Sequence, residues 1–356
     1  MLPTFASSWR PLFTRTMEDG VELAANVQPR TDLPMGPFAQ LPDGRIAARH
    51  ENRIRFSDDG GASWDDGVAF APAPTPEGAI ACSAGGALVF GYTDRARKTG
   101  LNWDEQTHDA PDAQLPCCVA RSTDGGKTWH HQTLHEDWTG AVRDMIRTSS
   151  GRLVMTSMKM LHDPGRHGVM TYCSDDEGAN WYPSNLIDLG GMGHHGGVTE
   201  PSVIELTDGT LMLLIRTNWG QFWYALSWNE GTGWHPMGPT GIDASSAPGI
   251  VKRLQSGRIA LVWNRAFPVA GPSDQWVRGG DGNWSAVPVS DFREELSIAF
   301  SEDDCKTWSP PRVMARKAGA RLCYPYVFEP RPGVLWVSTQ SNFGGVRLEL
   351  SEEAFL

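Results

Sequence analysis

The side chains of this sequence that could perform chemistry are arginines, carboxylates, histidines and tyrosines beside short apolar runs. A guanidinium offers two parallel N–H groups to a carboxylate, and carboxylates, imidazoles and phenols exchange protons with substrates. The candidates for catalysis are Tyr324, Glu200, His50 and Glu51. The candidates for binding are Arg216, Arg293, Arg49, Asn218, Trp219 and Arg265. If folding brings these groups together, they suit the recognition of a negatively charged ligand.

Metal and cofactor chemistry is not indicated by the sequence. His194 and His195 lie in the glycine-rich stretch GMGHHGG (191–197), but adjacent histidines seldom face one ion, so an exposed loop explains them more simply. Six scattered cysteines form neither a CxxC site nor a disulfide framework and are interpreted as buried thiols. We therefore expect no metal and no cofactor, and an activity that survives chelation.

An eight-residue pattern, Ser-x-Asp-x-Gly-x-Thr-Trp, recurs along the chain. It occurs as SDDGGASW (57–64), STDGGKTW (122–129) and SDDEGANW (174–181), and in degenerate form as SWNEGTGW (227–234) and SEDDCKTW (301–308). The Asp can accept backbone N–H groups within a turn, the Gly permits a positive φ, and the Trp can pack between sheets. Each copy therefore predicts a β-hairpin turn.

A second repeat pairs a small-Gly turn with an apolar strand. Its copies are PDGRIAA (42–48), GGALVFG (85–91), SGRLVMT (150–156), DGTLMLL (208–214), SGRIALV (256–262) and PGVLWVS (332–338). Six hairpins of this kind predict an all-β, six-bladed β-propeller of four-stranded antiparallel blades. We expect one domain over residues 1–356, closed by an N-terminal segment that pairs with strands around 345–353. A β-sandwich is the alternative.

The strand order indicates where a site would lie. In an up-and-down blade the two hairpins just described lie on one face of the propeller. The opposite face therefore carries the start of each first (inner) strand, the end of each second strand and the start of each third strand. The candidates above fall at these positions. So do Glu77, Asp94, Arg95, Arg143, Asp144, Lys159, His194, His195, Asn264 and Tyr326. Arginine, carboxylate, histidine and tyrosine at one rim suit an anionic sugar.

The octamers resemble the Asp boxes of the sialidase superfamily, and the likeness to bacterial BNR-repeat sialidase-like proteins covers nearly the whole chain. EPSVIELTDGTLMLLIR (200–216) is similar to the family stretch with an active-site Glu and, sixteen positions on, a carboxylate-binding Arg. REELSIAFSEDDCKTW (293–308) resembles the stretch that opens with another such Arg, and CYPYVFEPRPG (323–333) the one with the nucleophilic Tyr. The resemblance implies these roles for Glu200, Arg216, Arg293 and Tyr324, the last being preferred over Tyr326.

The sequence departs from the family at two points. Where sialidases carry an Arg-Ile-Pro motif, LPMGPFAQLPDG (33–44) places Pro34 or Met35. The loop before the first octamer, ARHENRIRF (48–56), is short and offers His50 or Glu51 in place of the family's proton-donating Asp. These departures weaken the case for sialic acid itself as the substrate.

Three functions remain open. The first is a sialidase-like glycoside hydrolase acting on a terminal acidic sugar, with Tyr324 as nucleophile, Glu200 as its base and Glu51 or His50 as proton donor. The second is a polysaccharide lyase acting next to a uronic acid, with His50 as base. The third is a propeller that binds carbohydrate without cleaving it.

Composition limits the partners and the location. The net charge of −11 argues against nucleic acid, and no apolar run approaches the ~20 residues of a membrane span. The N-terminal stretch MLPTFASSWRPLFTRTMEDG breaks the apolar core that a signal peptide needs. We expect a carbohydrate partner and a cytoplasmic location, or a secreted or periplasmic one if a leader has been removed.

Overall fold

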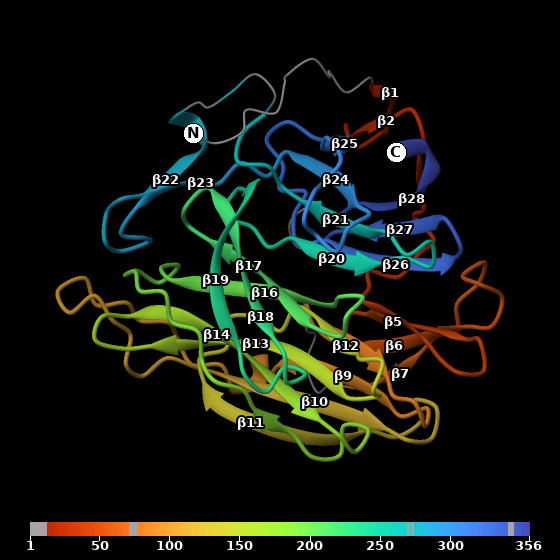
Figure 1. The fold of residues 1–356 in the computed structure, drawn as a ribbon, viewed down its shortest axis with the longest axis horizontal. Helices are drawn as coiled ribbons and strands as arrows, with labels where there is room; N and C mark the ends of the chain where they lie inside the picture. Colours follow the sequence, from red (N-terminus) through yellow and green to blue (C-terminus); the bar gives the residue numbers. More distant parts are fainter. Residues whose placement is uncertain (1–12, 71–76, 269–270, 272–273, 341–344) are drawn as a thin grey trace.

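The computed structural model describes residues 13–70, 77–268, 271, 274–340 and 345–356. Their sheets follow one another around the molecule in the order of the sequence (Figure 1). The regular secondary structure of the described residues is nearly all strand and forms the predicted six-bladed β-propeller of four-stranded antiparallel blades. None of its helical segments could cross a bilayer.

The first three blades each run outward in sequence order. Blade one consists of β4 (Phe38–Gln40), β5 (Ile46–His50), β6 (Arg53–Ser57) and β7 (Val68–Ala69). Blade two consists of β8 (Ala79–Cys82), β9 (Leu88–Thr93), β10 (Gln114–Ser122) and β11 (His130–Asp137). Blade three consists of β12 (Met145–Arg147), β13 (Leu153–Leu161), β14 (Arg166–Ser174) and β15 (Tyr182–Pro183).

Blade four again consists of consecutive strands, whereas blades five and six include strands from the beginning of the chain. Blade four consists of β16 (Val198–Glu205), β17 (Leu211–Thr217), β18 (Gln221–Ser227) and β19 (His235–Asp243). Blade five consists of β20 (Ile250–Arg253), β21 (Ile259–Trp263), β24 (Glu295–Ser301) and β25 (Arg312–Arg316), extended by β2 (Glu22–Ala24) and β1 (Phe13–Thr16). Blade six consists of β26 (Tyr326–Arg331), β27 (Val334–Ser338), β28 (Arg347–Ser351) and β3 (Val27–Pro29).

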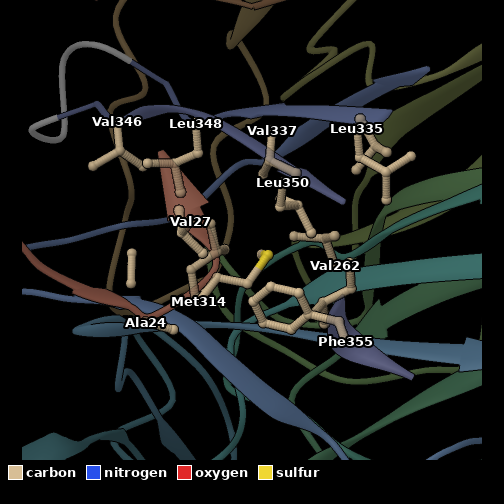
Figure 2. Packing of buried hydrophobic residues seen from close by; sticks show 14 of the residues in the cluster. Ala24, Val27, Val262, Met314, Leu335, Val337, Val346, Leu348, Leu350 and Phe355 are labelled. Carbon is tan, nitrogen blue, oxygen red and sulfur yellow. The ribbon is translucent and has the colours of Figure 1, made fainter. Parts of the chain in front are cut away.

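The ring is closed by the N-terminal strand β3. It pairs antiparallel with β28, with Val27 opposite Leu350 and Pro29 opposite Leu348, so the first part of the chain completes the last blade, as predicted. Figure 2 shows the buried side chains at this junction, where Val27 lies near Leu348 and Leu350. The pairing gives blade six its fourth strand, so that β28 is covered by β3 and is not left as the sheet edge.

Turn chemistry accounts for the first hairpin of every blade and for the Asp-box hairpin of blades one to five. The first turns have a glycine at positive φ, between 75° at Gly333 and 96° at Gly151. In the Asp-box turns, taking blade three as the example, Ser174 Oγ donates to Asp176 (2.9 Å) and accepts from the Gly178 N–H (2.9 Å), while Asp176 accepts the Asn180 N–H (2.8 Å). Because these bonds satisfy polar groups at a tight turn, the octamer specifies the outer hairpin.

Three connections are longer than a propeller needs. Between β9 and β10 lies a segment that begins with the 3₁₀ turn η1 (Arg95–Arg97), and a loop of residues 184–197 joins blades three and four. A third segment between β21 and β24 contains η2 (Asp274–Trp276), β22 (Val277–Gly279) and β23 (Pro288–Ser290). A final turn, η4 (Glu353–Phe355), follows β28. All six cysteines are unbonded thiols, five of them buried.

Candidate active site

Tyr324 and Glu200 form the centre of the site. The Tyr324 hydroxyl donates a hydrogen bond of 3.0 Å to Glu200 Oε1. Glu200 lies in β16 where the register with β17 is interrupted, with φ of 46°, and Tyr324 precedes β26 with φ of 61°. Positive φ at residues other than glycine is strained and clusters at functional sites. The two side chains come from blades four and six; Glu200 is buried and Tyr324 is half-buried.

Arg216 binds both members of this pair. Its Nη1 donates to Glu200 Oε2 and, at 3.4 Å, to the Tyr324 hydroxyl. Its Nε and Nη2 donate to Ser246 Oγ at 3.2 and 2.8 Å, and Ser246 in turn donates to Asn218 Oδ1 at 2.7 Å. Arg216 is therefore held in place by a chain of buried hydrogen bonds.

Arg293 approaches the tyrosine from blade five. Its Nη2 donates to the Ser246 carbonyl (2.5 Å), its Nε lies 3.1 Å from Asp291 Oδ1, and its guanidinium carbon lies 5.7 Å from the Tyr324 ring centre. Arg293 is 5% exposed. Sequence reasoning thus placed Glu200, Arg216, Arg293 and Tyr324 in one cluster, and the structure brings these four side chains together.

A further arginine, Arg143, also faces this cluster. It precedes β12, and its guanidinium carbon lies 5.1 Å from the Tyr324 ring centre and 4.8 Å from that of Tyr326. Its Nη1 donates to the Tyr326 hydroxyl (3.3 Å) and its Nη2 to the Pro325 carbonyl (3.0 Å). Its position at the start of an inner strand indicated the correct rim, but nothing in the sequence set it apart from the other charged residues there.

Arg49 occupies the region of the missing Arg-Ile-Pro arginine. Arg49 lies near the end of β5, just before the β5–β6 turn, and is 2% exposed. Its Nε donates a hydrogen bond of 2.7 Å to the Gly36 carbonyl. Gly36 directly follows Pro34 and Met35 in the segment where the family places that arginine. A guanidinium from the second strand of blade one therefore reaches this segment.

The site is electropositive although the protein is acidic. Four buried arginines, Arg49, Arg143, Arg216 and Arg293, surround the buried carboxylates Glu77 and Glu200. Burial raises the pKa of Glu200, but the charges of Arg216 and Arg143 outweigh it, so the pKa lies below its ordinary value and Glu200 is ionised. Burial and the charge of Glu200 raise the pKa of Tyr324, so the phenol is neutral.

The other predicted residues make different contacts. His50 ends β5 and Glu51 forms the exposed β5–β6 turn, and burial lowers the pKa of His50. Asn218 is buried and donates to the His195 carbonyl at 2.7 Å. It therefore helps to position Ser246, which in turn orients Arg216. Trp219 is partly exposed against Trp223, and Arg265 forms an ion pair of 3.0 Å with Asp243.

The three long connections meet beside the site, around His194 and His195. The His194 N–H donates to the Asn283 carbonyl and the His195 N–H to that of Trp284, both at 2.9 Å. The His195 ring lies 4.7 Å from that of Trp284, and burial with the charge of Arg216 lowers its pKa. Within the described ranges no group of three His, Cys, Asp or Glu side chains could hold a metal ion.

The central channel also opens on the Asp-box side. There it forms a cavity of about 750 Å³, lined by the far ends of the inner strands, such as Gln40, Arg147, Glu205 and Arg253. None of the candidate residues lines this cavity. The candidate site therefore lies at the opposite mouth, as the strand order predicted.

Six blades, five of them with Asp-box turns, and a Tyr–Glu pair beside buried arginines define a sialidase-like propeller. Within that class the chain belongs to the family described as BNR repeat-like domain, whose model matches residues 54–337. A sialidase from Micromonospora viridifaciens is 25% identical over 309 residues, which cover 80% of this chain and 45% of that protein. The chain thus spans less than half the length of this relative.

Solved structures share the fold at low identity. A protein of unknown function from Dyadobacter fermentans has a TM-score of 0.63 at 16% identity, covering 93% of this chain and 99% of its own. NanB sialidase from Streptococcus pneumoniae, as the K499G mutant, has a TM-score of 0.57 at 13% identity, covering 98% and 71%. Trypanosoma rangeli sialidase in complex with the inhibitor DANA has 0.56 at 14%, covering 96% and 58%. Together these likenesses show that the chain shares the propeller fold of these proteins.

Proposed function

We propose that the protein is a glycoside hydrolase that removes a terminal acidic sugar from a glycan. The observation that carries the proposal is the hydrogen bond between Tyr324 and Glu200, with the guanidinium groups of Arg216, Arg293 and Arg143 around the phenol. A tyrosine whose proton can pass to an ionised carboxylate can act as a nucleophile. The arginines can bind the carboxylate of a substrate.

Arg216 and Arg293 hold the carboxylate of the sugar. Both side chains are oriented by Ser246, which accepts from Arg216 through its hydroxyl and from Arg293 through its carbonyl. Guanidinium groups fixed in this way lose little side-chain entropy when they bind. Arg143 and Arg49 add positive charge in place of the family's missing first arginine, and this supports an acidic sugar as the substrate.

In the chemical step the Tyr324 oxygen attacks the anomeric carbon while its proton passes to Glu200 Oε1, the atom that it already contacts. The bond between the anomeric carbon and the leaving oxygen breaks, and that oxygen takes a proton from an acid in the site. Water then attacks the glycosyl–tyrosine, its proton returns to that acid, and the tyrosine leaves with the proton from Glu200. The neutral phenol approaches an anionic sugar without charge repulsion.

The proposal is tested with Tyr324→Phe and a fluorinated sugar acid. The substitution removes the nucleophilic oxygen and leaves the Glu200–Arg216 contact, so turnover should fall by at least about 100-fold with little loss of folding stability. Mass spectrometry of the wild type should show the sugar on the peptide that contains CYPYVFEP. Tyr182→Phe, on the outer strand of blade three, is the control and should keep normal rates. Normal turnover by Tyr324→Phe would refute the mechanism.

A lyase is the second candidate, supported by one observation. His50 is half-buried, its pKa is lowered by burial, and its Nδ1 has no hydrogen-bond partner among the described residues. A neutral imidazole can remove a proton next to a uronate. In that case His50→Ala would abolish activity, Glu200→Gln would have a mild effect, and the product would absorb in the ultraviolet as an unsaturated uronate.

A further inference from the structure

Glu77 is a buried carboxyl group at the mouth of the site. It lies two residues before β8, the inner strand of blade two, and its side chain is 6% exposed. The N–H of the next residue, Gly78, donates to the Tyr326 hydroxyl at 3.1 Å. This bond ties the backbone beside Glu77 to the segment that carries Tyr324, so the carboxyl group is positioned by the site itself.

The carboxyl oxygens of Glu77 are not committed to hydrogen bonds. Its Oε2 lies 3.6 Å from Arg143 Nη1 and its Oε1 lies 3.8 Å from Arg95 Nη2, both longer than a hydrogen bond. Oε2 is buried and accepts no hydrogen bond from any residue that the structure describes. Glu200, by contrast, uses both oxygens on Tyr324 and Arg216. Glu77 therefore retains the capacity to hold a proton or to bind a substrate.

The charges around the two carboxyl groups separate their protonation states. Burial raises the pKa of Glu77 to about 7, aided by the charge of Glu200 and opposed by Arg143, Arg95 and Arg49. The pKa of Glu200 is lowered. Two neighbouring carboxyl groups with pKa values pushed apart are the arrangement that assigns one as acid and the other as base. Among the described residues, the phenols of Tyr324 and Tyr326 also lie on this side.

We propose that Glu77 is the proton donor of this site, in the role that His50 and Glu51 were expected to fill. The inference rests on the proposed function. When Tyr324 attacks the anomeric carbon, the Glu77 proton passes to the leaving oxygen as its bond breaks. The resulting carboxylate faces Arg143 and Arg95, which stabilise it, and it then takes a proton from the water that releases the sugar.

The first test compares two leaving groups in Glu77→Gln. A glycan with an alkyl leaving oxygen needs protonation, so its kcat/KM should fall at least about 100-fold. An aryl glycoside with an acidic phenol needs little protonation and should lose less than about tenfold in its glycosylation step. Azide should restore turnover of the aryl glycoside, because it attacks the glycosyl–tyrosine without base help. Equal losses for both leaving groups, or no loss, would overturn the inference.

The controls separate this inference from the proposed function. Glu295→Gln removes another buried carboxyl group with a raised pKa, in blade five, and should affect neither substrate. Glu51→Gln tests the rival donor, and a loss confined to the alkyl leaving group in that variant would overturn the role of Glu77. Tyr324→Phe should lose activity on both substrates. If it does not, the proposed function fails irrespective of the result for Glu77.

The second test uses pH and includes a measurement that needs no substrate. A donor must be protonated, so kcat/KM should fall as the pH rises through about 7, and this alkaline limb should be absent in Glu77→Gln. The raised pKa of Glu77 also affects folding stability. The contribution of the protonated Glu77 to the free energy of unfolding is fully present below the pKa of a glutamate in the unfolded chain, and it is lost as the pH rises through about 7. The Tm of Glu77→Gln relative to the wild type should therefore increase over this interval. A constant Tm difference would overturn the inference.

Discussion

Glu200 and Tyr324 owe their contact to backbone conformations that most residues avoid. Both have positive φ, which costs of the order of 1–3 kcal/mol for residues other than glycine. The conformation turns their side chains toward each other across the gap between blades four and six. Hydrogen bonds to Arg216 and packing under Arg143 and Arg293 offset the strain. The strain is therefore part of how the site is oriented.

The first prediction at the residue scale concerns the carboxylate clamp. Arg216→Lys keeps the charge but loses the planar fork that contacts Glu200, Tyr324 and Ser246 together. We expect KM for a carboxylated sugar to rise roughly tenfold or more, since a charge-assisted hydrogen bond contributes about 1.5–3 kcal/mol. Steady-state kinetics on matched acid and amide substrates measures this change.

Arg253→Lys is the matched control. Arg253 lies at the Asp-box mouth of the channel, where it forms an ion pair of 2.5 Å with Asp304. Its substitution should leave KM unchanged. A normal KM in Arg216→Lys, or an equal increase for the amide substrate, would remove Arg216 from carboxylate binding.

Sequence patterns predicted part of the site and missed the rest for identifiable reasons. Glu200 and Arg216 lie on adjacent strands of one hairpin, so their proximity follows from local structure. Tyr324 and Arg293 required the family resemblance. Glu77 and Arg143 were expected at the correct rim, but their importance arises from burial and from contacts made across blades, and neither can be read from the local sequence.

At the scale of elements, the side-chain hydrogen bonds of the Asp box stabilise the outer hairpin of the blade. The prediction is made for Ser174, whose hydroxyl is fully buried and joins Asp176 to the Gly178 N–H. Ser174→Ala leaves that N–H without its acceptor, so the free energy of unfolding should fall by about 1–3 kcal/mol, while KM stays unchanged because the turn lies on the face opposite the site. Urea denaturation measures the loss.

Ser150→Ala is the control for this experiment. Ser150 lies in the first turn of the same blade and is exposed, so its removal should change stability by less than about 0.5 kcal/mol. A similarly small change in Ser174→Ala would show that the hydrogen bonds of the Asp box contribute little to folding stability. An increased KM would show that the turn affects substrate binding at the opposite face.

The hairpins could be predicted from sequence because their turns have specific residue requirements. The docking of the long connections could not. The loop of residues 184–197 meets the segment before β23 through backbone bonds such as His194 N–H to Asn283 O, and such bonds carry no sequence signature. The addition of β1 and β2 to blade five was missed for the same reason, since β2 pairs with β25 almost three hundred residues away.

At the scale of the molecule, stability depends on the closure between β3 and β28. Leu350 is 2% exposed and lies opposite Val27 in the cluster of Figure 2. Leu350→Ala should lower the free energy of unfolding by about 2–5 kcal/mol, because it leaves a cavity where the two ends of the chain meet. Thermal unfolding followed by circular dichroism measures the change.

Leu356→Ala is the control, since Leu356 is 44% exposed at the end of the chain. It should unfold like the wild type. A loss below about 1 kcal/mol in Leu350→Ala would mean that the ring holds together without a well-packed junction.

Closure by the first strand also has a consequence for biosynthesis. β3 (Val27–Pro29) leaves the ribosome before its partner β28 (Arg347–Ser351), which is made more than three hundred residues later. At about 5–20 residues per second, the strand waits roughly 15–60 s for its place in the sheet. Until β28 has been made, the nascent propeller is an open arc of blades, and β3 has no partner strand. A closing strand of 3 residues offers little surface for mispairing during that wait.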